Sequence, residues 1–113
     1  MLGVGASDAR LKTDVVSLTD EIDVFETLSR LRGVAFNWDR SKEPMKNAPD
    51  RREIGMIAQE VEDVLPSLVT QNRDGYRSLD YAKLAAFLVE VAKAQQAEIA
   101  ELRRMVEALA AQR

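Results

Sequence analysis

The sequence predicts a small head of mixed helices and strands, followed by one long helix that forms a parallel coiled coil with other copies of the chain. The chain has 113 residues, the length of a single domain. Helical and strand-like hydrophobic periods alternate between residues 19 and 79, whereas no glycine or proline interrupts the chain from Tyr81 to Arg113. We therefore expect residues 7–79 to form the head and residues 80–113 to form the coiled-coil helix.

A first helix is expected from Thr19 or Asp20 to Arg32. Either of the first two residues can cap its N-terminus, and acidic residues in the first turn suit the positive end of the helix macrodipole. Gly33 ends the helix. Its buried stripe is expected to consist of apolar residues that recur at every third position: Ile22, Phe25, Leu28 and Leu31.

A strand and a loop follow this helix. Val34, Phe36 and Trp38 alternate with other residues, which predicts a half-buried strand over residues 34–38 with these three side chains in the core. Residues 39–52 contain two prolines and many charged residues, so we expect a surface loop there.

A second strand is expected over residues 53–57. Ile54 and Ile57 should face the core, and Gly55 should allow another part of the chain to approach the backbone closely. A short helix over residues 58–65, ended by a proline, and a hairpin should complete the head. The Asp-Gly turn chemistry of residues 72–75 predicts the hairpin, with strands over Leu68–Gln71 and Tyr76–Leu79.

The last helix should begin at Asp80, a favourable N-cap, with Leu79 and Leu84 in the positions of a hydrophobic staple. Its apolar residues repeat with spacings of three and four, apart from one stutter between Gln95 and Ile99. One alternative is a single amphipathic helix packed on its own domain, but the repeat extends further than so small a head. The expected seam comprises Tyr81, Leu84, Leu88, Val91, Gln95, Ile99, Leu102, Val106 and Leu109.

Composition excludes several classes of site. The chain has no cysteine and no histidine, so disulfides, thiol nucleophiles, Cys/His zinc sites and histidine bases are absent, and we expect no metal and no cofactor. The 16 basic and 19 acidic residues give a net charge of -3 without a basic stripe, which disfavours nucleic-acid binding. The longest apolar run, Leu84–Val89, is too short for a membrane span, and the first six residues do not resemble a signal peptide, so we expect no membrane association.

Five blocks of the sequence resemble a known module in the order in which that module carries them. The module is the intramolecular chaperone auto-processing domain found at the C-termini of phage tailspikes, tail fibres and endosialidases, and within the myelin regulatory factor. The blocks are SDARLKTD (7–14), LSRLRGVAFNW (28–38), IGMIAQEVE (54–62), DGY (74–76) and LDYAKL (79–84).

The resemblance implies an α+β head with a C-terminal three-stranded coiled coil. It implies a homotrimeric chaperone that folds an upstream fibre client of the same polypeptide, with residues 1–6 as the remnant of that client. It also implies self-cleavage by a Ser-Lys dyad, with Ser7 as nucleophile, Lys12 as base and Ala6–Ser7 as the bond that breaks. The place of action would be the host cytoplasm during phage assembly, after which the client enters the virion tail and the chaperone is released.

The residue types agree with such chemistry. A serine hydroxyl needs an adjacent base, and without histidine Lys12 is the candidate, provided that burial or nearby cations favour its neutral amine. Arg10 could favour the neutral amine or hold the oxyanion, and Asp8 is a further candidate beside the pair. The Ser7 hydroxyl can reach the Ala6 carbonyl and form an ester that water hydrolyses.

Two alternatives to a self-cleaving chaperone remain at the level of sequence. One is a trimerisation and folding module that does not cleave, in which Ser7 and Asp8 belong to an ordinary solvated turn and Asp8 and Asp14 are turn or cap residues. The other is a coiled-coil adaptor of unrelated origin.

Overall fold

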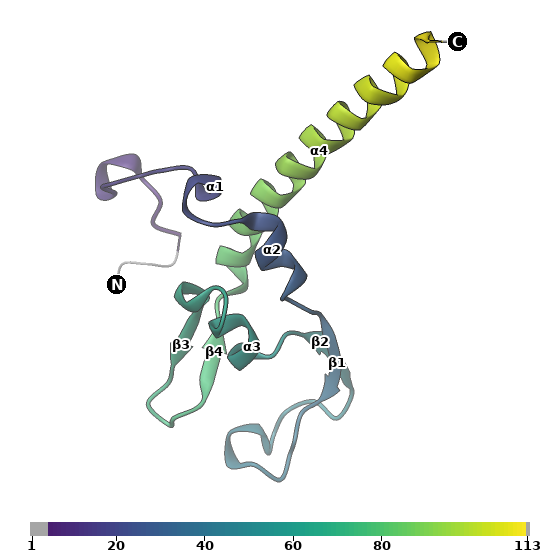
Figure 1. Ribbon diagram of the computed structural model, residues 1–113. Coiled ribbons are helices and arrows are strands. Elements are labelled where there is room, and N and C mark those ends of the chain that lie inside the picture. The colour runs from purple at the N-terminus through teal and green to yellow at the C-terminus, as the bar shows by residue number, and fades with distance from the viewer. Residues whose placement is uncertain (1–4, 113) are drawn as a thin grey trace.

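The computed structural model of the chain describes residues 5–112. It shows a small head, a long helix that projects from it, and an N-terminal arm (residues 5–17) to one side (Figure 1). The molecule is elongated, with extents of 67 × 39 × 21 Å. In chain order the elements are η1 (Ala9–Leu11), α1 (Leu18–Glu21), α2 (Val24–Ser29), β1 (Val34–Asn37), η2 (Glu43–Met45), β2 (Arg52–Gly55), α3 (Ala58–Glu62), η3 (Pro66–Leu68), β3 (Val69–Gln71), β4 (Arg77–Leu79) and α4 (Tyr81–Ala111), where η marks a 3₁₀ helix.

The predicted long C-terminal helix is confirmed as α4. The Asp80 carboxylate caps it by accepting hydrogen bonds from the backbone N–H groups of Ala82 at 3.0 Å and Lys83 at 3.2 Å. The proximal half of α4 (residues 81–94) packs on the head, whereas nearly every residue of the distal half (95–111) is exposed (Figure 1). Within the described part of the chain, no helix has both the length and the apolar character that a membrane span needs.

The core of the head lies where α2, α3 and η3 meet the proximal half of α4. Its largest member, Phe87, is only 2% exposed and is not part of the predicted seam. Because aromatic residues are only 5% of the chain, branched aliphatic side chains fill most of the remaining volume. The buried cluster comprises Val24, Val61, Leu65, Leu68, Phe87 and Val91.

The prediction of one continuous helix up to Arg32 is wrong. The chain leaves the helical conformation at Ile22 and begins a second helix, α2, which ends at Ser29. Asp23 causes the break, because its carboxylate accepts the backbone N–H groups of Phe25 and Glu26 as an N-cap, both at 3.1 Å.

The break also changes which residues face the core. Val24 and Thr27 are buried, whereas Phe25, predicted to lie in the buried stripe, is 39% exposed. The other predicted stripe residues, Ile22, Leu28 and Leu31, are partly buried against the core cluster.

Each predicted strand is present, and the strands form two antiparallel pairs. β1 pairs with β2 so that Val34 lies opposite Gly55, and β3 pairs with β4 so that Val69 lies opposite Leu79. Gly75 adopts a left-handed φ of +88° in the β3–β4 turn, as the Asp-Gly prediction requires. The predicted short helix ends early, at Glu62, and the loop after β1 contains η2.

The prediction that Ile54 faces the core is wrong, because its side chain is 88% exposed. The close approach predicted at Gly55 is confirmed: a Cβ atom there would lie 2.8 Å from the Tyr81 hydroxyl and 3.2 Å from the Phe36 ring. The Cα hydrogen of Gly55 that takes the place of a side chain faces Tyr81. Because neighbouring positions of a strand face opposite sides, the side chain of Ile54 lies on the outer face. Ile57, just beyond the strand, is 38% exposed.

Trp38 also differs from its prediction. Alternating burial along β1 is confirmed, with Val34 and Phe36 half-buried. Trp38 lies just after the strand and is 40% exposed. Its ring packs edge-on against Phe36, with ring centroids 4.9 Å apart, so Trp38 covers the flank of the sheet rather than filling the core.

Candidate functional site

The N-terminal arm (residues 5–17) places the predicted dyad residues in direct contact. The Lys12 Nζ donates a hydrogen bond to the Ser7 Oγ at 2.9 Å. The short helix η1 brings them together, because the Leu11 N–H donates to the Asp8 carbonyl at 3.0 Å and the Lys12 N–H to the Ala9 carbonyl at 3.2 Å. One 3₁₀ turn therefore returns the chain far enough for a lysine to reach a serine five positions earlier.

Asp8 and Arg10 form an ion pair within the same turn. The Asp8 Oδ1 accepts the Arg10 backbone N–H at 2.9 Å and the Arg10 Nε–H at 3.1 Å, while its Oδ2 accepts the Arg10 Nη2–H at 2.8 Å. Asp8 is thus both the N-cap of η1 and the partner of a guanidinium. These hydrogen bonds hold the pKa of Asp8 below its ordinary value and raise the pKa of Arg10.

The arm is open to water in the single chain. Every residue from Gly5 to Ser17 is exposed, including the apolar side chains of Leu11, Val15 and Val16. The peptide bond between Ala6 and Ser7 lies in this accessible segment, just after Gly5, which adopts a left-handed φ of +80°. The geometry therefore supplies a serine–lysine contact beside an accessible peptide bond, without a cover that excludes water.

The predicted seam of α4 divides between two environments. Val91 is buried in the head, and Leu84 packs against the same core cluster. Gln95 is exposed, and five apolar members are 45–65% exposed in the single chain: Leu88, Ile99, Leu102, Val106 and Leu109. Whether they form a trimer interface stays a prediction.

Phe87, which takes the buried position between Leu84 and Val91, is absent from the predicted seam. A signal for it exists, since Leu84, Phe87, Val91 and Ala94 also follow three-four spacing. A side-chain pair between Arg32 and Glu60 was also missed, with Nε–Oε1 and Nη2–Oε2 both at 2.8 Å. It joins the segment after α2 to α3, lowers the pKa of Glu60 and does not involve the arm.

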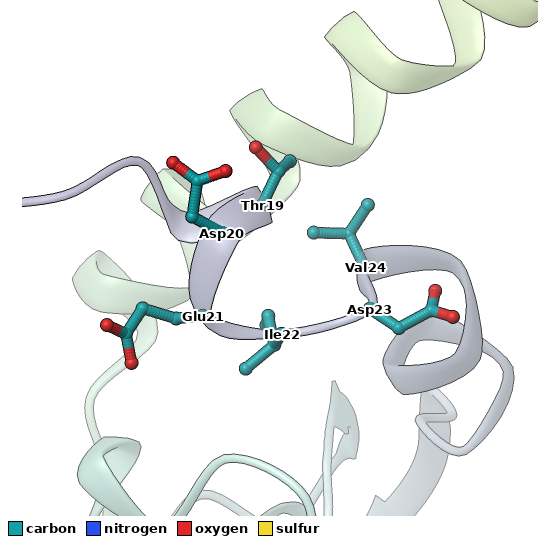
Figure 2. A pocket seen from close by; sticks show the side chains of 6 residues that line it. All are labelled: Thr19, Asp20, Glu21, Ile22, Asp23 and Val24. Atoms are coloured by element: carbon teal, nitrogen blue, oxygen red, sulfur yellow. The ribbon is translucent and has the colours of Figure 1, made fainter.

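Two hollows lie elsewhere on the described surface. Figure 2 shows one at the turn from α1 to α2, where the carboxylates of Asp20, Glu21 and Asp23 point in different directions. A groove between the first strand pair and the β3–β4 hairpin has a mixed polar and apolar lining that includes Trp38 and Tyr76. Neither hollow includes Ser7 or Lys12 among its lining residues.

Comparison with known proteins gives two matches. The model of a peptidase family described as "Chaperone of endosialidase" matches residues 7–70. The chain is also 32% identical, over 110 residues, to the long tail fiber protein Gp37 of Salmonella phage S16. That alignment covers 92% of this chain and 14% of the relative, so the chain spans a small part of the length of the protein that it matches.

Proposed function

The chain belongs to the chaperone-of-endosialidase family, and from this membership we propose that it is a C-terminal intramolecular chaperone of a phage tail fibre or tailspike. It assembles as a parallel homotrimer, guides three client chains into register and then cuts itself off between Ala6 and Ser7. Its similarity to a long tail fiber protein supports a fibre as client. The chaperone acts in the host cytoplasm during phage assembly, and the client continues into the virion tail.

The contact between Ser7 and Lys12 is the observation that supports cleavage most directly. Ser-Lys pairs are an established variant of the serine nucleophile with a general base, and the two atoms lie 2.9 Å apart. The family match begins at residue 7, so the residues before Ser7 fall outside the part that the family shares. A cut before Ser7 would therefore separate a client-derived segment from the family module.

The proposed reaction proceeds through an ester. Lys12, as the neutral amine, takes the proton of the Ser7 hydroxyl while Oγ attacks the carbonyl carbon of Ala6. The tetrahedral intermediate breaks its C–N bond, and Lys12 returns the proton to the departing nitrogen of Ser7. The Ala6 carboxyl is then esterified to the Ser7 hydroxyl. Water hydrolyses this ester, which leaves a free carboxylic acid on Ala6 and restores the hydroxyl of Ser7.

Assembly supplies what the single chain lacks at this site. A base works only after losing its proton, and a water-filled surface favours the charged ammonium. The exposed apolar residues of the distal half of α4 give a surface for other copies, and those of the arm can be covered in the same assembly. Cleavage would then follow correct trimerisation, because only the assembled protein excludes water from Lys12.

The openness of the dyad also favours a second candidate function, a trimeric folding module that does not cleave. The two candidates differ in one product. Cleavage removes residues 1–6 from the chain, whereas the second candidate retains them, and intact mass spectrometry separates these outcomes.

A fusion with a reporter domain joined ahead of Met1 tests the proposed function. The wild type should give two products, and N-terminal sequencing of the smaller should begin at Ser7. Hydroxylamine, which attacks esters faster than amides, should accelerate their appearance. Ser7→Ala should leave the fusion whole and still trimeric. Ser17→Ala is the matched control, because the Ser17 side chain makes no capping hydrogen bond. Cleavage of the Ser7→Ala fusion at the same bond would overturn the assignment.

A further inference from the structure

The segment between Ser7 and Lys12 carries a carboxylate that could interfere with the base. Asp8 directly follows the nucleophile and lies on the same 3₁₀ turn as Lys12. A carboxylate near a lysine stabilises the ammonium form, which cannot accept a proton. A working dyad on this turn therefore needs the Asp8 carboxylate to pair with a group other than Lys12.

Arg10 pairs with both oxygens of that carboxylate. Both carboxylate oxygens of Asp8 accept hydrogen bonds from Arg10, at 3.1 Å and 2.8 Å from the side chain, and Oδ1 also accepts the Arg10 backbone N–H. This bidentate arrangement is charge-assisted and fixes the orientation of both side chains. The Lys12 Nζ is left with the Ser7 hydroxyl as its hydrogen-bond acceptor among the described residues.

Among residues 5–112, no carboxylate forms an ion pair with Lys12 in the single chain. Every residue of the arm, Lys12 included, is exposed in the single chain. Asp14 is the remaining carboxylate nearby on the arm. It adopts a left-handed φ of 54° and forms no ion pair with Lys12. Asp8 and Arg10 are thus the charged residues that lie between Ser7 and Lys12 on this turn.

We infer that Arg10 is a positioning residue for the cleavage: it sequesters the Asp8 carboxylate, so that Asp8 can cap the turn without holding Lys12 as an ion-pair partner. The inference rests on the proposed self-cleavage. It assigns distinct tasks to the two residues. Asp8 fixes the turn that brings Lys12 to Ser7, and Arg10 neutralises the negative charge that the cap introduces.

Removing one charge at a time separates these tasks. Arg10→Ala frees the Asp8 carboxylate to pair with Lys12, so the midpoint of the cleavage pH profile should move upward by about 1 pH unit. The rate at neutral pH should fall about tenfold for the same reason. Asp8→Asn keeps a capping oxygen and leaves the Arg10 cation unpaired, so the midpoint should move downward.

The double variant Arg10→Ala with Asp8→Asn is the decisive comparison. It keeps a capping oxygen at position 8 but lacks both the carboxylate and the guanidinium. Its midpoint should return close to that of the wild type. The experiment measures cleavage of the reporter fusion against pH, with trimer mass and circular dichroism checked for each variant. Arg30→Ala is the control for losing a surface arginine, since Arg30 pairs with Glu26 on α2 and lies outside the arm.

The outcomes distinguish this inference from the function on which it rests. A slower Arg10→Ala fusion with an unshifted midpoint, or a double variant as slow as Arg10→Ala, would mean that the pair only stabilises the turn and would overturn the inference. Cleavage that requires Ser7 but does not respond to Arg10 would overturn the inference alone. Absence of cleavage by the wild type at every pH, or cleavage of the Ser7→Ala fusion, would overturn the proposed function itself.

Discussion

The two halves of α4 carry the same kind of apolar repeat and lie in different surroundings. In the proximal half, Phe87 and Val91 are 2% and 4% exposed because the head covers them. In the distal half, Leu102 and Leu109 are 55% and 65% exposed because no part of the described chain reaches them. A periodic stripe therefore predicts that a helix face is to be buried, but it does not say whether its own domain or another chain buries it.

The largest expected effect comes from the distal half. If three copies bury Leu102 together, Leu102→Ala removes about 2–5 kcal/mol of packing at each of three equivalent positions. The trimer should dissociate at micromolar concentration, as measured by sedimentation equilibrium, while the head stays folded. Glu107→Ala, outside the predicted seam on the same half, should leave the trimer intact. An unchanged mass and melting temperature for Leu102→Ala would mean that the seam is assigned wrongly.

Substitutions in the proximal half of α4 should instead destabilise the head. Phe87→Ala empties the centre of the head core and should cost about 3–5 kcal/mol of unfolding free energy. The single tryptophan, Trp38, lies in the head and reports its unfolding by fluorescence in urea. Val89→Ala is the matched control, because Val89 is 57% exposed on the same helix. Equal destabilisation by both substitutions would contradict the placement of Phe87 in the core.

Gln95 lies where the two halves meet and should give the smallest effect. It is a polar residue in an otherwise apolar repeat, which lowers stability but fixes the register of a coiled coil. Gln95→Leu should raise the melting temperature of the trimer, with a gain of about 1 kcal/mol per chain. A lower melting temperature, measured by circular dichroism, would show that Gln95 makes favourable contacts between the chains.

The sequence predicted α4, its Asp80 cap, the four strands and the turn between β3 and β4, because these depend on local propensity and turn chemistry. It did not predict the break at Asp23, where a capping side chain competes with a helical pattern that looks continuous. It also placed Ile54 on the wrong face. Which residues of β2 face inward is fixed by the contact between Gly55 and Tyr81, and these two residues are far apart in the chain. Tertiary contacts of this kind leave no periodic signal.

At the candidate site, the catalytic roles of Ser7 and Lys12 stay predictions. The family resemblance pointed to Ser7 and Lys12, and the structure brings their side chains into hydrogen-bond contact. The pairing of Asp8 with Arg10 could not be predicted from their spacing alone, because residues two apart lie on different faces of a helix and meet here only through the local turn. Only the side-chain positions show that Arg10 binds the Asp8 carboxylate.

The central claim is that Lys12 is the base of a self-cleavage reaction. Intact mass spectrometry of the Lys12→Arg fusion, which shows whether that fusion is cut, tests this claim most directly. An arginine keeps the positive charge but does not give up its proton, so it cannot act as a base. The account predicts that the wild-type fusion yields a product beginning at Ser7, whereas the Lys12→Arg and Lys12→Ala fusions both stay whole. Cleavage of the Lys12→Arg fusion at the wild-type rate would contradict the account, because the base would then have to be another group.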